Sequence, residues 1–170
     1  MKKTLLIAML LLNAFGFSQL SMKKLNGTPI NNGEFFVFNY ATNPEVYLGF
    51  KLVKSSSNPI NVKAELVSMT NTTGLSTQLC FGGTCVADIA AGNSYPSDSD
   101  IIEANSQNGN YDHFLNRNSG ANTNQIVEYV FRFYMINALN FEVGNSVSFT
   151  YRYASNLVTN EFNELNNIGI

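Results

Sequence analysis

The stretch that decides the fold reads Leu79-Cys80-Phe81-Gly82-Gly83-Thr84-Cys85-Val86. Two adjacent glycines suit the two-residue loop of a tight β-hairpin, because both central positions of a type I′ turn need positive φ. A turn at Gly82-Gly83 places Cys80 opposite Cys85 on the paired strands, at a spacing that permits a disulfide. The stretch therefore predicts a hairpin stapled by a Cys80–Cys85 disulfide.

The same hairpin has one apolar face. Side chains alternate along a strand, so Leu79, Phe81 and Val86 share a face, and the two cysteines lie on the other. If the apolar face is the core side, the disulfide lies on the outside of the domain. A redox or zinc site is not expected, because a C-x4-C pair with one histidine in the chain supplies neither C-x-x-C spacing nor four ligands.

Alternating apolar residues on both sides of the hairpin predict further strands. The clearest are 60–67 and 126–136, with others at 35–40, 46–53 and 147–153 and an edge segment at 25–30. Residues 92–124 are the least regular part, where only 101–102 and 113–115 indicate brief strands. Short strands at this spacing predict an all-β fold, a single immunoglobulin- or fibronectin-like sandwich of about seven or eight antiparallel strands over residues 19–154.

The first residues predict an export signal. Lys2 and Lys3 precede an apolar run at 5–12, and small residues at 16–18 suit cleavage before Gln19. Residues 1–18 are thus expected as a signal peptide, and 155–170 as a linker-like tail. The 152 residues that follow the signal peptide suit one domain. No later segment is long and apolar enough for a membrane helix.

The charge balance excludes some classes of partner. The chain has 10 basic and 12 acidic residues, and loss of Lys2 and Lys3 leaves a net charge of −4. A mildly acidic chain without a basic cluster argues against nucleic acid and against anionic lipid surfaces. A paired cysteine set is typical of an exported protein.

Catalysis and bound cofactors are not expected. His113 is the only histidine, and its neighbour Asp112 must point to the opposite face if both lie on a strand. There is no G-x-S-x-G motif. A hydrolase with a site in residues 92–124 is kept as an alternative.

Two weaker patterns suggest ligands. Asp98, Asp100 and Asp112, with Glu103, offer oxygens to calcium, but the stretch around Asp98 lacks the glycine and distal glutamate of an EF-hand loop, so no metal site is expected. Four tyrosines could line a sugar-binding face, which makes a carbohydrate-binding module an alternative function. They are Tyr47, Tyr95, Tyr111 and Tyr134.

Several segments together resemble the immunoglobulin-like passenger domains of bacterial proteins exported by the type IX secretion system. The segments are Leu25-Asn26-Gly27-Thr28-Pro29-Ile30, Asn71-Thr72-Thr73-Gly74, the cysteine hairpin, Asp112-His113-Phe114-Leu115-Asn116, Tyr129-Val130-Phe131-Arg132-Phe133-Tyr134 and Ser148-Phe149-Thr150-Tyr151-Arg152-Tyr153. Residues 161–170 are similar to the lead-in to a C-terminal sorting domain, although the sorting domain itself is missing.

The resemblance implies a secreted β-sandwich and supplies no catalytic residues. We therefore expect a secreted or cell-surface, non-catalytic module for adhesion or accessory protein interaction. Its expected partners are the export machinery and a surface glycan or protein. The expected location is extracellular or on the cell surface, and the periplasm if no sorting domain follows.

Overall fold

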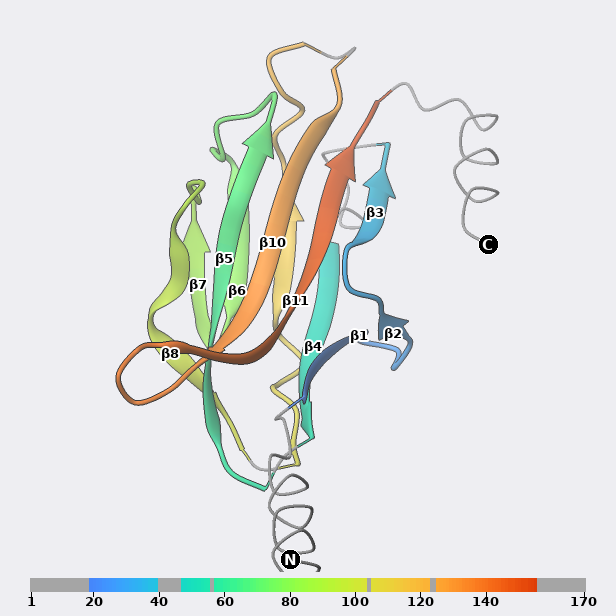
Figure 1. Cartoon of the computed structure of the whole chain (residues 1–170). Helices are drawn as coiled ribbons and strands as arrows, with labels where there is room; N and C mark the ends of the chain where they lie inside the picture. The colour runs from blue at the N-terminus through green and yellow to red at the C-terminus, as the bar shows by residue number, and fades with distance from the viewer. Residues whose placement is uncertain (1–18, 40–46, 56, 104, 123–124, 156–170) are drawn as a thin grey trace, which may run out of the picture.

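The computed structural model describes residues 19–39, 47–55, 57–103, 105–122 and 125–155 (Figure 1). Within these residues every regular element is a strand. The strands are β1 (Gln19–Lys24), β2 (Pro29–Ile30), β3 (Glu34–Phe38), β4 (Tyr47–Ser55), β5 (Ile60–Thr70), β6 (Thr77–Phe81), β7 (Thr84–Ala87), β8 (Ser94–Ile102), β9 (His113–Asn116), β10 (Val127–Ile136) and β11 (Glu142–Tyr153). The predicted signal peptide and residues 156–170 lie outside the described ranges.

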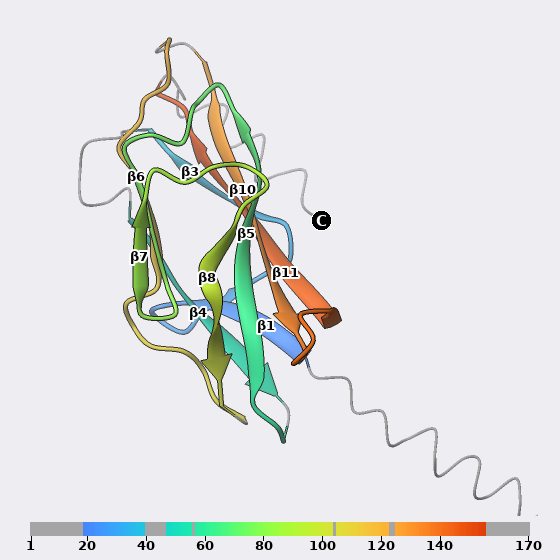
Figure 2. The same cartoon turned by 90° about the vertical axis from the view of Figure 1, so that its left-hand side faces the viewer.

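The strands form two sheets that pack as a sandwich, which confirms the predicted all-β, immunoglobulin-like fold. The six-stranded sheet has the order β2-β1-β4-β9-β6-β7, and the five-stranded sheet has the order β3-β11-β10-β5-β8. Figure 2 shows the hairpin of β6 and β7 in one layer and β5, β10 and β11 in the other. No helix in the described ranges is long and apolar enough to cross a membrane.

The strand count and one pairing differ from the prediction. The described ranges hold eleven strands rather than seven or eight, and β3 runs parallel to β11. The segment predicted as an edge at 25–30 is mostly a turn between β1 and the two-residue β2. In the irregular region, β8 is nine residues long and its backbone pairs with β5. Its full length was not predicted because its polar residues Asp98 and Ser99 gave no alternating signal.

Aromatic side chains from both sheets fill the core. Phe133 of β10 contacts Phe50 of β4 and Phe81 of β6, with ring centroids 5.0 and 5.5 Å apart. Phe114 of β9 meets Tyr151 of β11 edge-on at 4.9 Å. Such pairs add about 0.5–1.5 kcal/mol each beyond the burial of their area. The strands predicted at 126–136 and 147–153 are confirmed as β10 and the second half of β11, and their alternating apolar residues are buried.

The hairpin has the predicted geometry. Gly82 and Gly83 have φ of 61° and 74°, and Cys80 is the direct partner of Cys85, with the sulfur atoms at disulfide distance. Leu79 is 1% exposed, so the apolar face is the core side. The cysteine pair therefore lies on the outward face of the six-stranded sheet.

One charged residue lies on the inward face of β4. The strand continues to Ser55, beyond the predicted end at residue 53, and the alternation that buries Leu52 therefore also buries Lys54, which is 1% exposed. Its Nζ has no hydrogen-bond partner among the described residues. Burial lowers the pKa of Lys54, and the nearby Glu103 opposes this shift.

Candidate functional site

The outward face of the six-stranded sheet carries two aligned rows of side chains across β4, β9, β6 and β7. The first row is Gly49, His113, Cys80 and Cys85. The second row is Tyr47, Leu115, Gln78 and Ala87. Because side chains alternate along each strand, both rows point away from the aromatic core. This face is called the outer sheet face below.

Tyr47 and His113 form a tilted ring pair on the outer sheet face. Their ring centroids are 4.4 Å apart at an interplanar angle of 31°. The ring of Tyr47 covers Gly49, where an added Cβ would lie 2.8 Å from Tyr47 Cε1 and 2.5 Å from Leu25 Cδ1. The absence of a side chain at Gly49 therefore lets the tyrosine lie flat against the sheet.

The imidazole of His113 is held from both sides. Its Nδ1 lies 2.7 Å from the carbonyl oxygen of Tyr111, and its Nε2 lies 3.4 Å from Gln78 Oε1. Neither nitrogen contacts Asp112, which precedes β9 and has its carboxylate bound by Asn108 and the Gly82 N–H. The arrangement lacks the histidine–carboxylate contact of a catalytic triad.

A cavity of about 440 Å³ opens next to the second row. It is lined by Ser76, Thr77, Gln78, Ala87, Asp88, Leu115 and Arg117. Leu115 and Ala87 supply apolar surface, while Gln78, Asp88 and Arg117 supply polar groups. Its volume lies within the range of small-ligand pockets, roughly 300–1,000 Å³.

Hydrogen bonds fix one wall of the cavity. The backbone N–H of Ser76 donates to Asp88 Oδ1 at 2.8 Å, and Thr77 Oγ1 donates to the Gly74 carbonyl at 2.6 Å. Ser76 and Asp88 both have positive φ, 58° and 55°, a conformation that non-glycine residues rarely adopt. The wall is thus defined by local bonds in the absence of ligand.

The cavity has one cation and one anion on its rim. The N–H of Arg117 donates to the Ser76 carbonyl, and the N–H of Asp88 donates to the Thr77 carbonyl, so the two residues flank β6 on opposite sides. Two strand spacings separate their backbones by about 10 Å. Among the described residues, neither charge belongs to an ion pair.

The acidic candidates come together only in part. Gly82 lies between Asp100 and Asp112: an added Cβ there would lie 2.6 Å from Asp100 Cβ, and the Gly82 N–H donates to the Asp112 carboxylate. Asn108 donates its amide to the same carboxylate. Asp98 is exposed on β8 and takes no part in this contact.

Burial raises the pKa of Asp112 to about 7, and the charge of Asp100 adds to the shift. The Gly82 N–H and the Asn108 amide oppose it. Asp112 is only 4% exposed, so its carboxyl is closed to a substrate. The contacts of Gly82 with Asp112 and with Asp100 instead connect the hairpin turn to β8. No group of three or more metal-ligating side chains occurs in the described ranges.

The four tyrosines do not form one face. Tyr47 lies on the six-stranded sheet, and the exposed Tyr111 is linked to it through His113. Tyr95 and Tyr134 belong to β8 and β10 of the other sheet. The Tyr95 hydroxyl accepts from the Ala90 N–H at 3.0 Å.

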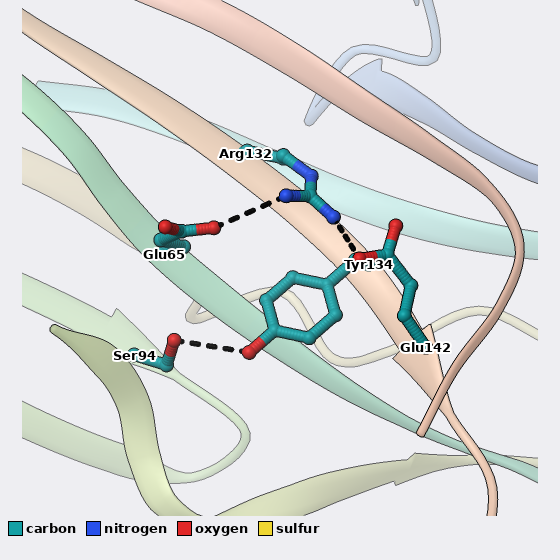
Figure 3. Close-up of polar contacts among 5 residues, drawn as sticks. All are labelled: Glu65, Ser94, Arg132, Tyr134 and Glu142. Carbon is teal, nitrogen blue, oxygen red and sulfur yellow. Dashed lines mark hydrogen bonds and ion pairs between the residues drawn. The ribbon is translucent and has the colours of Figure 1, made fainter. Parts of the chain in front are cut away.

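The outward face of the five-stranded sheet carries a network of ion pairs. Figure 3 shows Arg132 between Glu65 and Glu142, next to Tyr134. Its guanidinium carbon lies 4.9 Å from the centre of the Tyr134 ring, and the tyrosine hydroxyl lies 3.0 Å from Ser94 Oγ. These charges satisfy one another, so this face offers a ligand fewer free groups than the cavity does.

Several cavity residues were not predicted from the sequence. Strand alternation alone would have placed Gln78 and Leu115 outward. Asp88 and Arg117 lie just beyond the ends of β7 and β9, and no sequence pattern marks them as neighbours.

No family model and no curated protein matches the sequence. Among solved structures, the N-terminal domain of PorA is similar at 16% identity and a TM-score of 0.45, covering 81% of this chain and 98% of that one. The ASH / PapD-like domain 7 of human CEP192 is similar at 11% identity and a TM-score of 0.41, covering 82% of this chain and 86% of that one. With both TM-scores below 0.5, neither likeness bears on function.

Proposed function

We propose that this chain is an exported, non-catalytic recognition module that binds its ligand on the outer sheet face. The observation that carries the proposal is the cavity of about 440 Å³ between Arg117 and Asp88. Its wall is fixed by hydrogen bonds at Ser76 and Thr77. A site that exists before binding loses less conformational entropy when its ligand arrives, which favours recognition.

The arrangement of titratable groups supports a binding role over a hydrolytic one. The cavity lining includes no histidine or cysteine, and its single carboxylate, Asp88, accepts a bond from the Ser76 backbone. His113 is engaged by Tyr111 and Gln78, and Asp112 is buried. A general acid or base needs access to a substrate proton, which the buried Asp112 does not have, and the accessible Asp88 has no histidine beside it in the cavity lining.

Export is part of the proposal. It is supported by the predicted signal peptide, by a cysteine pair at disulfide distance, and by the resemblance of the chain to type IX secretion cargo domains. Disulfides persist in oxidising compartments outside the cytosol. The module then acts at the cell surface or beyond it, in adhesion or as an accessory interaction domain, or in the periplasm if no sorting domain follows.

A steric block of the cavity tests the proposal. Ala87→Tyr places a large side chain at an exposed cavity position. Ser68→Tyr, at an exposed position of β5 on the other sheet, is the matched control. The full chain is tested against immobilised polysaccharides, mucins and matrix proteins. We expect binding that Ala87→Tyr abolishes and Ser68→Tyr leaves intact. Binding that Ala87→Tyr leaves unchanged, or no binding at all, contradicts the proposal.

A further inference from the structure

We propose that the cavity binds a neutral sugar unit of a glycan chain, an inference that rests on the proposed recognition function. The cavity lining combines apolar and polar side chains. Leu115 and Ala87 supply apolar surface with Gln78 between them in the same row, and Asp88 and Arg117 supply the charged groups. A sugar ring has the matching chemistry, with C–H groups on its faces and hydroxyl groups around its edge.

The rim offers both donors and acceptors. The guanidinium of Arg117 only donates, the carboxylate of Asp88 only accepts, and the amide of Gln78 does both. Gln78 Oε1 lies near His113 Nε2, which leaves its amide N–H groups for a ligand. Sugar hydroxyls donate and accept, so one sugar can use all three side chains at once.

The charges at the rim favour a neutral ligand. Arg117 and Asp88 lie on opposite sides of β6 and are not paired with other charges in the described ranges. An acidic sugar is attracted by Arg117 but repelled by Asp88, and a basic ligand meets the reverse. A neutral hydroxylated ring accepts a charge-assisted hydrogen bond from Arg117 and donates one to Asp88 with no repulsion.

The outer sheet face continues the site beyond the cavity. Leu115, in the cavity lining, is the direct strand partner of Tyr47 on β4, and Tyr47 is 37% exposed. A glycan chain that places one sugar in the cavity can therefore lay the next against the Tyr47–His113 pair. This geometry indicates that an oligosaccharide binds more tightly than a monosaccharide.

The experiment compares three probe sets by calorimetry with the full chain. One set holds neutral hexasaccharides of glucan, mannan, xylan and galactan type, the second holds hexagalacturonate and sialyllactose, and the third holds collagen peptides and mucin-derived peptides. The variants are Arg117→Met, Asp88→Asn and Ala87→Tyr, with Lys63→Met on the opposite sheet as the control. Asp88→Asn keeps an oxygen for the Ser76 N–H, removes the charge and replaces the second acceptor oxygen by an NH2 donor.

We expect a neutral hexasaccharide to bind. Loss of one charge-assisted hydrogen bond in Arg117→Met or Asp88→Asn should weaken that binding by about tenfold or more, Ala87→Tyr should abolish it, and Lys63→Met should leave it unchanged. Binding of only acidic sugars or only peptides, still lost in Ala87→Tyr, overturns the sugar assignment and leaves the recognition function standing. No binding sensitive to Ala87→Tyr in any set overturns both.

Discussion

Cys80 and Cys85 are direct partners on β6 and β7, with their Cα atoms 4.0 Å apart on the outward face of the six-stranded sheet. β7 is the last strand of that sheet and carries Ala87, which lines the cavity. The disulfide therefore ties a wall of the candidate site to its neighbour β6.

Removal of this disulfide should cost little global stability. The closed loop spans only a sequence separation of five residues, and the chain-entropy model gives a loss of about 2 kcal/mol for so small a loop. We expect the double change Cys80→Ala and Cys85→Ala to lower the free energy of unfolding in urea by about that amount, with faster amide exchange in β7. If the amide exchange rates in β7 do not change in this variant, the disulfide does not hold β7 in place locally.

Gly74 supports the wall of the cavity and should not tolerate a side chain. Its φ is +76°, and an added Cβ would lie 1.9 Å from the Ile89 carbonyl oxygen. Gly33 is the matched control, because its φ is +80° but nothing lies within 4 Å of an added Cβ. We expect Gly33→Ala to cost about 1 kcal/mol and Gly74→Ala several times more, measured by urea unfolding. Equal costs would show that the Ile89 contact is absent.

The buried Lys54 should destabilise the fold. A buried charge without a partner is costly, and burial lowers the pKa of Lys54. The folded state therefore binds fewer protons at this site than the unfolded state, and stability falls as the pH decreases. We expect Lys54→Met to raise the free energy of unfolding by about 1–3 kcal/mol at pH 7. Lys51→Met, on the outward side of β4, should change it by less than about 0.5 kcal/mol.

The effect of Asp112 on stability should depend on pH in the opposite direction to that of Lys54. Burial, with help from the charge of Asp100, raises the pKa of Asp112 to about 7, whereas an aspartate in an unfolded chain titrates near 3.9. The folded state binds more protons between these values, so the contribution is complete below about pH 4 and is lost as the pH rises to about 7.

Unfolding in urea at a series of pH values measures this effect. Between pH 5 and 7 the contribution of Asp112 to stability should fall, at a slope of up to roughly 1.4 kcal/mol per pH unit. Asp112→Asn should remove that component, and Asp98→Asn, at an exposed position of β8, should retain it. A wild-type profile identical to that of Asp112→Asn would mean that Asp112 titrates normally.

The strands with strict alternation could be predicted from sequence, and the site could not. The period-two pattern of β10 reflects burial of one face, and Gly82-Gly83 requires positive φ, so both features are local. The cavity depends instead on Ser76, Asp88 and Arg117, which lie at strand ends and meet only through the pairing of β6 with β7 and β9. Only the end of β8, at 101–102, was predicted, because the rest of the strand has no alternating apolar residues and is defined by its pairing with β5.

The sequence supports an expectation for some of the candidate site residues and none for others. Opposite directions for Asp112 and His113 were expected if both lay on a strand, but Asp112 precedes β9 and is buried, whereas His113 is the first residue of the strand. The approach of Asp100 to Asp112 across the two sheets depends on the hairpin turn at Gly82, which no spacing in the sequence reveals.

The central claim is that the outer sheet face binds a ligand at the cavity. Its most direct test is a titration of the ¹⁵N-labelled chain with a neutral hexasaccharide, followed by amide chemical shifts. We predict that the largest shifts fall on Ser76, Asp88 and Arg117, that smaller ones extend to Tyr47 and His113, and that Ala87→Tyr removes them all. Shifts confined to β5 and β10 of the opposite sheet, or none at saturating sugar, would contradict the account.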